Sequence, residues 1–210
     1  MARKTKEEAL ATRNLLLDTA EHLFSSQGVA NTSLHEIAET AGLTRGAIYW
    51  HFDNKSDLLT ALWERVAASL RASFDGEDSE HGQDDPLGKV RLKASYKSRH
   101  IESSPQIRAL LTILMLRCEF TKETHSAGEY FLREREHAYA CVRKDLDRAI
   151  AIGQLPASVN AEQAAIGLFG LIDGLCFHWL INPSRFSITT TTLTAIDAYL
   201  AGLSQTPSVR

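Results

Sequence analysis

Cysteine is scarce in this sequence, and the spacing of the few thiols excludes the frameworks that cysteines commonly build. Cys118, Cys141 and Cys176 are odd in number and far apart along the chain. Neither a disulfide scaffold nor a paired zinc motif has this arrangement. We therefore expect three free thiols that pack as small apolar side chains, and no bound metal.

The short motifs of common enzymes are missing too. The chain contains no G-x-S-x-G, no G-x-G-x-x-G and no phosphate-binding loop. His35 and Glu36 begin a zinc-protease pattern, but position 39 is glutamate where that pattern needs a second histidine. The sequence predicts a protein that is not an enzyme and that uses no cofactor.

An excess of positive charge is also lacking. The formal net charge is −3, and the first 60 residues carry six Lys and Arg against eight Asp and Glu. Any DNA binding must therefore depend on a few well-placed cations and on helix ends. No apolar segment follows the basic start of the chain, so we expect no secretory signal and a cytoplasmic protein.

Helical periodicity is present almost everywhere. Apolar residues recur at helical spacing, and no run alternates in the manner of a strand. The pattern predicts an all-α fold of about nine helices, punctuated by proline and glycine. The expected helices cover residues 7–27, two short segments within 33–52, and residues 54–74, 87–102, 106–117, 123–152, 160–181 and 191–203.

The segment 75–85 differs from its surroundings. It holds six acidic residues and two glycines, with no apolar residue to anchor it. This composition is typical of a solvated loop, so we expect a domain boundary here. The order of the acidic residues does not fit a calcium-binding loop.

Residues 32–59 (TSLHEIAETAGLTRGAIYWHFDNKSDLL) have the pattern of a helix-turn-helix. Ser33 and Glu36 have the spacing of a capping box, and Gly42 stands where the first helix would end. Spacing alone is equally compatible with a buried helix pair that binds no DNA. A helical ligand-binding or protein-binding module therefore stays open as an alternative.

The string TRGAIYWHFDNKSDLL, residues 44–59, closely resembles the TetR family of bacterial repressors, in particular the members that repress multidrug efflux pump operons. The opening MARKTKEEA, LRCEF at 116–120 and DGLCFHWL at 173–180 are also similar. The resemblance implies a homodimer that binds pseudo-palindromic operator DNA and is released by an effector. It implies a DNA-binding domain at 1–53, a connecting helix at 54–74 and an effector-binding and dimerisation domain at 75–210.

The resemblance also implies a recognition helix at residues 44–50 that enters the major groove. Arg45 is expected to read base edges, because a guanidinium can pair bidentately with guanine, and Gly46 would allow close backbone approach. We expect Trp50 and Phe52 to pack instead. The remaining predicted DNA contacts are Thr32, Ser33, Thr44, Tyr49, His51 and Lys55, together with Arg3 and Lys4 of a basic arm.

The segment 160–181 is apolar on nearly every side. As a membrane span it would place Asp173 near the bilayer centre, at a cost of about 2.5–3.5 kcal/mol. We therefore expect no membrane, and a helix buried between partners. The resemblance implies a dimer interface that includes Gly167, Gly170, Gly174 and Trp179. It implies an effector pocket lined by Leu92, Tyr96, Leu111, Met115, Phe169 and Asp173.

One stretch does not fit an apolar drug pocket. Residues 89–100 (KVRLKASYKSRH) are strongly cationic. The sequence leaves three explanations open: an exposed helix, an effector that is not neutral, or release by an anti-repressor protein in place of a small molecule.

Overall fold

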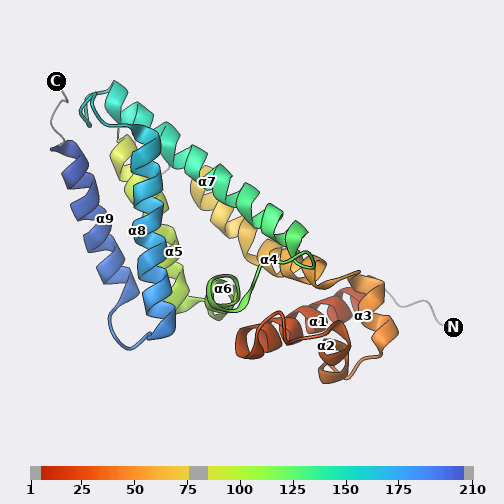
Figure 1. Ribbon diagram of the computed structural model, residues 1–210. Helices are drawn as coiled ribbons and strands as arrows, with labels where there is room; N and C mark the ends of the chain where they lie inside the picture. The colour runs from red at the N-terminus through yellow and green to blue at the C-terminus, as the bar shows by residue number, and fades with distance from the viewer. Residues whose placement is uncertain (1–5, 76–84, 206–210) are drawn as a thin grey trace. The chain divides into compact units, whose positions relative to one another are not determined.

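The computed structural model describes residues 6–75 and 85–205, and every element of regular secondary structure in these ranges is a helix, which confirms the predicted all-α class. Arg3 and Lys4 of the predicted basic arm, and residues 76–84 of the acidic segment, lie outside the described residues. The elements (Figure 1) are α1 (Lys6–Gln27), α2 (Leu34–Thr40), α3 (Arg45–His51), α4 (Lys55–Asp75), α5 (Pro86–Ser103), α6 (Pro105–Thr112), the π-helical turn η1 (Ile113–Arg117), α7 (His125–Ala151), α8 (Ala161–Ile181) and α9 (Ile188–Ser204).

The chain divides into two compact units that interleave along the sequence. The first unit comprises residues 1–67 and 106–133, and the second comprises residues 68–105 and 134–210. Helix α6 and the start of α7 therefore belong with the N-terminal helices. Each unit is therefore built from two separate stretches of the sequence.

Local sequence signals position the short helices of the first unit. The Ser33 hydroxyl accepts a hydrogen bond from the Glu36 amide at 3.1 Å, and the Glu36 carboxylate accepts one from the Ser33 amide at 3.4 Å. This pair is the predicted capping box. Gly42 has φ 68°, a left-handed conformation that favours glycine at the turn between α2 and α3. The buried side chains beneath these helices are Leu16, Leu17, Ala20, Phe24, Ile37, Ala38 and Ile48.

In the second unit, α5, α8 and α9 lie side by side (Figure 1). Ser95 and Ser98 are buried on α5, where each hydroxyl bonds to a backbone carbonyl of its own helix and leaves room for a close neighbour. Glu102 of α5 accepts hydrogen bonds from the Ile188 amide at 3.2 Å and the Thr189 hydroxyl at 3.0 Å. These bonds fix the start of α9 against the end of α5.

Three cations of α5 are paired with carboxylates within the second unit. Arg91 pairs with Asp197 of α9 at 2.5 Å, Lys93 with Asp145 of α7 at 2.6 Å, and Lys97 with Asp173 of α8 at 2.8 Å. Each cation thus joins α5 to a different helix. Intramolecular pairing accounts for these three cations, and it was not among the explanations that the sequence left open.

Candidate nucleic-acid interface and effector-domain site

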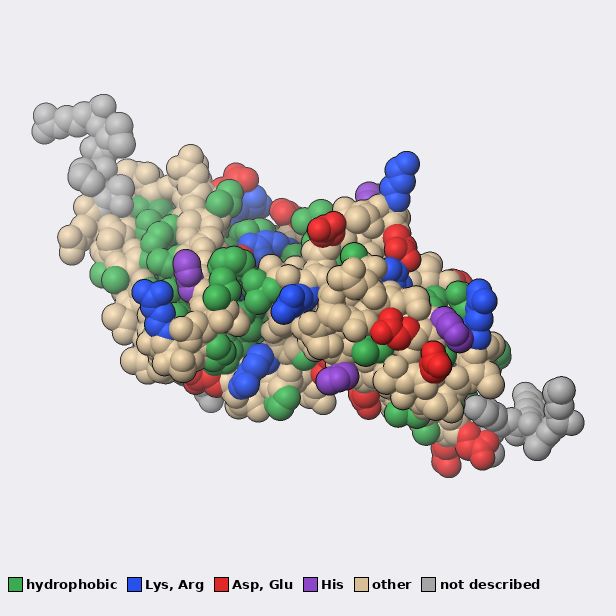
Figure 2. Space-filling view, turned by 60° about the horizontal axis from the view of Figure 1, so that its bottom comes forward, with side chains coloured by type: hydrophobic (Ala, Val, Ile, Leu, Met, Phe, Trp, Pro, Cys, Tyr) green, Lys and Arg blue, Asp and Glu red, His purple; other side chains and the backbone are tan. Residues whose placement is uncertain are grey.

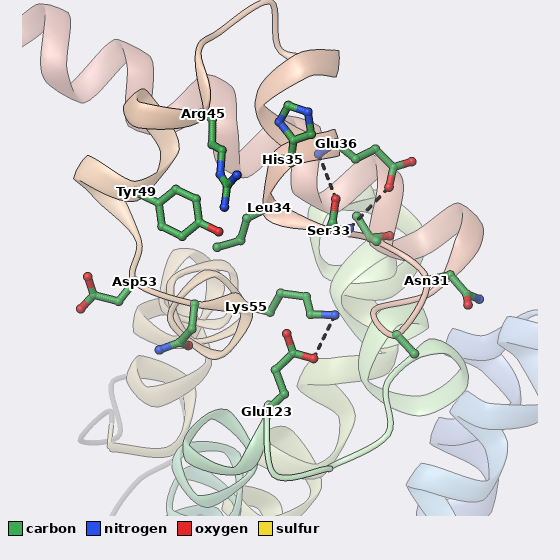
Figure 3. A pocket seen from close by; sticks show the side chains of 13 residues that line it. Asn31, Ser33, Leu34, His35, Glu36, Arg45, Tyr49, Asp53, Lys55 and Glu123 are labelled. Atoms are coloured by element: carbon green, nitrogen blue, oxygen red, sulfur yellow. Dashed lines mark hydrogen bonds and ion pairs between the residues drawn. The ribbon is translucent and has the colours of Figure 1, made fainter.

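A groove of about 590 Å³ opens in the first unit beside the helix-turn-helix (Figure 3). Its walls come from the turn between α1 and α2, from α2 and α3, and from the start of α4. Glu123, which precedes α7, also lines it. The lining residues are Ala30, Asn31, Thr32, Ser33, Leu34, His35, Glu36, Arg45, Tyr49, Asp53, Asn54, Lys55 and Glu123.

The side chains of α3 divide into a buried and an exposed set. Ile48 is fully buried, whereas Arg45 and Gly46 are exposed and Tyr49 is 44% exposed. The Arg45 guanidinium lies over the Tyr49 ring, 5.6 Å from its centroid. Thr44 is the N-cap, because its hydroxyl accepts a hydrogen bond from the Ala47 amide at 3.2 Å. The helix therefore presents a cationic and aromatic face on the side away from its core.

Two aromatic residues at the end of α3 behave differently. Phe52 is 3% exposed, which confirms the prediction that it packs. The same prediction for Trp50 is wrong, because Trp50 is 71% exposed. Its ring meets the half-buried His51 ring edge-on at 4.5 Å. Helical spacing placed Trp50 among core candidates, but packing leaves that side of α3 uncovered.

Thr32 and Lys55, both predicted to bind phosphate, are turned inward. Thr32 is 1% exposed, and its hydroxyl donates to the Gly28 carbonyl at 2.8 Å. Lys55 is 8% exposed; its ammonium donates to the Val29 carbonyl at 3.1 Å and pairs with Glu123 at 3.1 Å. These side chains tie parts of the first unit together. Ser33 is exposed, although its hydroxyl already caps α2.

Asp173 lies at the centre of a half-buried charged cluster in the second unit. Its carboxylate accepts hydrogen bonds from Lys97 of α5 at 2.8 Å and from Arg135 of α7. Arg135 also donates to the Tyr139 hydroxyl at 3.0 Å. Burial alone would raise the pKa of Asp173, but the two cations outweigh burial and hold this pKa below its ordinary value.

The other predicted pocket residues fall in both units. Tyr96 stacks on His100 with centroids 4.0 Å apart, and Phe169 meets Tyr139 edge-on at 4.4 Å. Leu92 is half-buried and also belongs to the second unit, whereas Leu111 and Met115 belong to the first. Lys97 and Arg135, the partners of Asp173, and Tyr139, the partner of Arg135, were not predicted from the sequence. No sequence signal identifies such partners, because they meet only through helix packing.

Helix α8 has one exposed apolar stripe. Ile166, Phe177 and Ile181 are 56%, 39% and 59% exposed, and Gly170 and Gly174 are exposed between them. The five positions follow one another at intervals of four, four, three and four residues, so they share one face. On the face in Figure 2, hydrophobic side chains gather over the part of the chain that the C-terminal helices form.

Of the residues predicted at the dimer interface, Trp179 is buried within the chain and Gly167 is half-buried against α9. A Cβ at position 167 would be 2.5 Å from the Tyr199 hydroxyl of α9, so Gly167 serves the contact between α8 and α9 of one protomer. Trp179 is 4% exposed. Gly170 and Gly174 have no other heavy atom within 4 Å of such a Cβ, and they remain candidates for the interface.

Family models match both parts of the sequence. Residues 16–62 match the family described as bacterial regulatory proteins, tetR family, and residues 85–205 match the C-terminal region of MAATS-type transcriptional repressors. The chain belongs to the TetR family. Because this is a family of transcriptional regulators, the prediction that the chain is not an enzyme is confirmed.

Individual TetR-family relatives agree along nearly the whole chain. The transcriptional regulator AcrR of Shigella flexneri is 38% identical over 188 residues, which cover 90% of this chain and 87% of AcrR. The crystal structure of NalD, the secondary repressor of the MexAB-OprM multidrug efflux pump in Pseudomonas aeruginosa, matches with TM-score 0.84 and 31% identity. That match covers 95% of this chain and 99% of NalD.

A third relative carries a bound small molecule. The structure of SmeT in complex with triclosan matches with TM-score 0.79 and 29% identity, over 95% of both chains. SmeT is the repressor of the Stenotrophomonas maltophilia multidrug efflux pump SmeDEF. TetR-family repressors bind operator DNA as dimers and respond to small-molecule effectors.

One helix of this TetR-family chain also passes a simple test for a membrane span. Among the described residues, α8 alone is long and apolar enough to cross a bilayer. Its buried residues Leu168, Ile172 and Cys176 pack inside the second unit. One face of α8 in the core of the second unit and a second, exposed apolar face account for this composition.

Proposed function

We propose that the chain is a homodimeric, cytoplasmic repressor of a multidrug efflux operon, released from its operator by a small-molecule effector. Family membership and the relatives AcrR, NalD and SmeT support this function. The observation that carries the proposal for this chain is the exposed face of α3. Arg45 and Tyr49 stand out from a fully buried Ile48, so the helix has a face free to enter a major groove.

In this proposal Arg45 reads base edges, and Gly46 allows the backbone to approach the duplex. Thr44, Tyr49 and His51 contact phosphate or sugar. The backbone around Ser33 offers a further contact at the edge of the groove. Thr32 and Lys55 contribute first to the internal structure of the DNA-binding head, by which we mean helices α1 to α3 and the start of α4. Their polar atoms are engaged in hydrogen bonds within the chain.

The apolar stripe of α8 is proposed as the dimer interface. A partner helix would bury the exposed apolar side chains of Ile166, Phe177 and Ile181. Gly170 and Gly174 would let that helix approach closely. Dimerisation matters for DNA binding, because two heads read half-sites about 34–36 Å apart or a multiple of that spacing.

The effector is proposed to bind beside the charged cluster of the second unit. Asp173 with Lys97 and Arg135 supplies convergent polar groups, and Phe169 and Tyr139 supply aromatic surface. The bound triclosan of SmeT supports a small molecule as the effector. An anti-repressor protein would instead predict that no small molecule lowers operator affinity.

The test is a fluorescence-anisotropy titration of the DNA upstream of the chain's own gene, at two salt concentrations. Wild-type protein should bind tightly at low salt and weaken steeply as salt is added. Arg45→Ala should lose about 1–3 kcal/mol of discrimination between the operator and an unrelated duplex.

Arg143→Ala is the matched control, because Arg143 is an exposed arginine on α7, far along the chain from the helix-turn-helix. Its affinity should equal that of the wild type. If neither the wild type nor the control binds the duplex at low salt, the repressor proposal fails. The chain would then be a helical binding module.

A further inference from the structure

The segment between α6 and α7 is bonded to the helix-turn-helix head within the first unit. The Val29 amide, in the turn between α1 and α2, donates to the Arg117 carbonyl at 3.0 Å. Arg117 ends the π-helical turn η1. The chain after α6 therefore contacts the head by a direct backbone hydrogen bond.

A second attachment joins the starts of α4 and α7. The Ser56 and Ser126 hydroxyls share a hydrogen bond of 2.8 Å, and the Ala127 amide donates to the Ser56 hydroxyl at 2.8 Å. Ser56 is 2% exposed and Ala127 is buried, whereas Ser126 is exposed, so the attachment is partly shielded from water. The two attachments, at Arg117 and at Ser126 with Ala127, fix this segment on both sides of Glu123.

Glu123 enters the groove that the proposed DNA-binding residues line. In Figure 3 its carboxylate points at the Lys55 ammonium, while Arg45 and Tyr49 stand on the wall that α3 forms. The Glu123 side chain is 58% exposed and the Lys55 side chain 9%. A negative charge therefore sits at the open side of a buried cation, in a groove that a DNA backbone would approach.

A phosphate and Glu123 make opposing demands on Lys55. Both are anions, so a phosphate that approaches the ammonium also approaches the carboxylate and is repelled. The ammonium already donates to the Val29 carbonyl and pairs with the Glu123 carboxylate, so a phosphate would have to share it with both. A close Lys55–phosphate contact requires the Glu123 carboxylate to withdraw.

We propose that Glu123 and an operator phosphate compete for Lys55, so that the segment between α6 and α7 restrains the DNA affinity of the head. The inference rests on the operator contacts proposed above and adds to them a phosphate contact of Lys55, which forms only when Glu123 withdraws. By thermodynamic linkage the effect is reciprocal. A change that withdraws Glu123 from Lys55 strengthens DNA binding, and DNA binding weakens the ion pair between Lys55 and Glu123.

The π-helical turn η1 is the part of this segment where a change of conformation could release Glu123. Residues Ile113–Arg117 are wound more widely than an α-helix, and such turns are rare and frequently occur at functional sites. Rewinding η1 as α-helix would move the Arg117 carbonyl away from Val29. The Glu123 carboxylate, six residues after Arg117, would move with the Arg117 carbonyl.

The test compares Glu123→Gln with wild type by operator titration over a range of salt concentrations. Glutamine keeps the size of the side chain and one acceptor oxygen but removes the negative charge. Affinity should rise on the order of 5-fold. The salt dependence should steepen by about one phosphate contact, a slope change of roughly 0.9.

Two further proteins isolate the mechanism. Glu129→Gln is the matched control, because Glu129 is an exposed carboxylate that pairs with His125 on its own helix and does not line the groove. It should bind as wild type does. In a Lys55→Met background, Glu123→Gln should give a much smaller gain, which a double-mutant cycle measures as coupling.

Thermal unfolding of each variant establishes that it is folded. If folded Glu123→Gln binds the operator with unchanged or reduced affinity while wild type binds well, the competition is refuted and the pair only holds the head together. If wild type does not bind the operator at low salt, the proposed operator contacts fail, and the inference fails with them.

Discussion

The Tyr199 hydroxyl occupies the space beside Gly167 that any larger residue would need. It donates to the Ala164 carbonyl of α8 at 2.9 Å, and a Cβ at position 167 would lie 2.5 Å from it. The absence of a side chain at this position therefore lets α9 close on α8 within one protomer.

Gly167→Ala should destabilise the fold. The Tyr199 ring would have to move and give up its hydrogen bond, which we expect to lower the free energy of unfolding by about 1–3 kcal/mol. Urea denaturation at a fixed protein concentration measures the change. Gly170→Ala is the control, because no side chain and no other helix of the chain lies within 4 Å of a Cβ at this position. A loss at Gly170 that depends on protein concentration would arise between protomers.

The proposed dimer face can be tested by adding charge to it. Ile166→Asp should dissociate the dimer, because an unpaired carboxylate would be buried against the partner helix. Analytical ultracentrifugation should show a shift to monomer. Ile152→Asp provides the comparison, since Ile152 is 40% exposed just after α7 and outside the stripe. A dimer that survives the change at Ile166 would place the interface elsewhere.

Local chemistry explains which parts of the head could be predicted. The capping box of Ser33 and Glu36 and the left-handed Gly42 depend on residues at most a few positions apart. Such signals are readable in the sequence because the hydrogen bonds form within one turn. The helix bounds were accordingly predicted to within a few residues.

Contacts between distant residues explain what could not be predicted. The buried state of Lys55 depends on Val29 and Glu123, which are 26 and 68 positions away. The family resemblance implied Gly167 at the dimer interface, and nothing in the sequence indicated that the Tyr199 hydroxyl of α9 lies against it within the same chain. Sequence periodicity indicates that a face is apolar or small, yet it does not indicate which element covers that face.

Asp173→Asn should destabilise the second unit and change its acid sensitivity. The variant leaves Lys97 and Arg135 close together without a carboxylate, at an expected cost of about 1–3 kcal/mol at pH 7. The pKa of Asp173 is lowered from 3.8 in the folded chain, so its ionised form stabilises the fold above that value. This contribution is lost as the pH falls through the folded-state pKa.

The pH profile separates this cluster from a surface ion pair. The stability difference between wild type and Asp173→Asn should be full near neutral pH and should narrow below pH 3.8, as measured by chemical denaturation. Asp197→Asn breaks the Arg91 pair, in which both side chains are about half exposed. Its cost should stay within about 1 kcal/mol because solvent screens the pair. Equal costs for both variants would contradict the importance of the cluster.

Trp50 and Phe52 should respond oppositely to truncation. Phe52 is 3% exposed, so Phe52→Ala should cost about 3–5 kcal/mol of unfolding free energy. Trp50 is 71% exposed, so Trp50→Ala should change stability by less than about 0.5 kcal/mol. Because the indole stands on the same short helix as Arg45, we expect Trp50→Ala to weaken operator binding while the protein stays folded. Urea denaturation and anisotropy on the same preparation measure both effects. If Trp50→Ala lowers the free energy of unfolding as much as Phe52→Ala does, Trp50 packs in the core and the expectation is wrong.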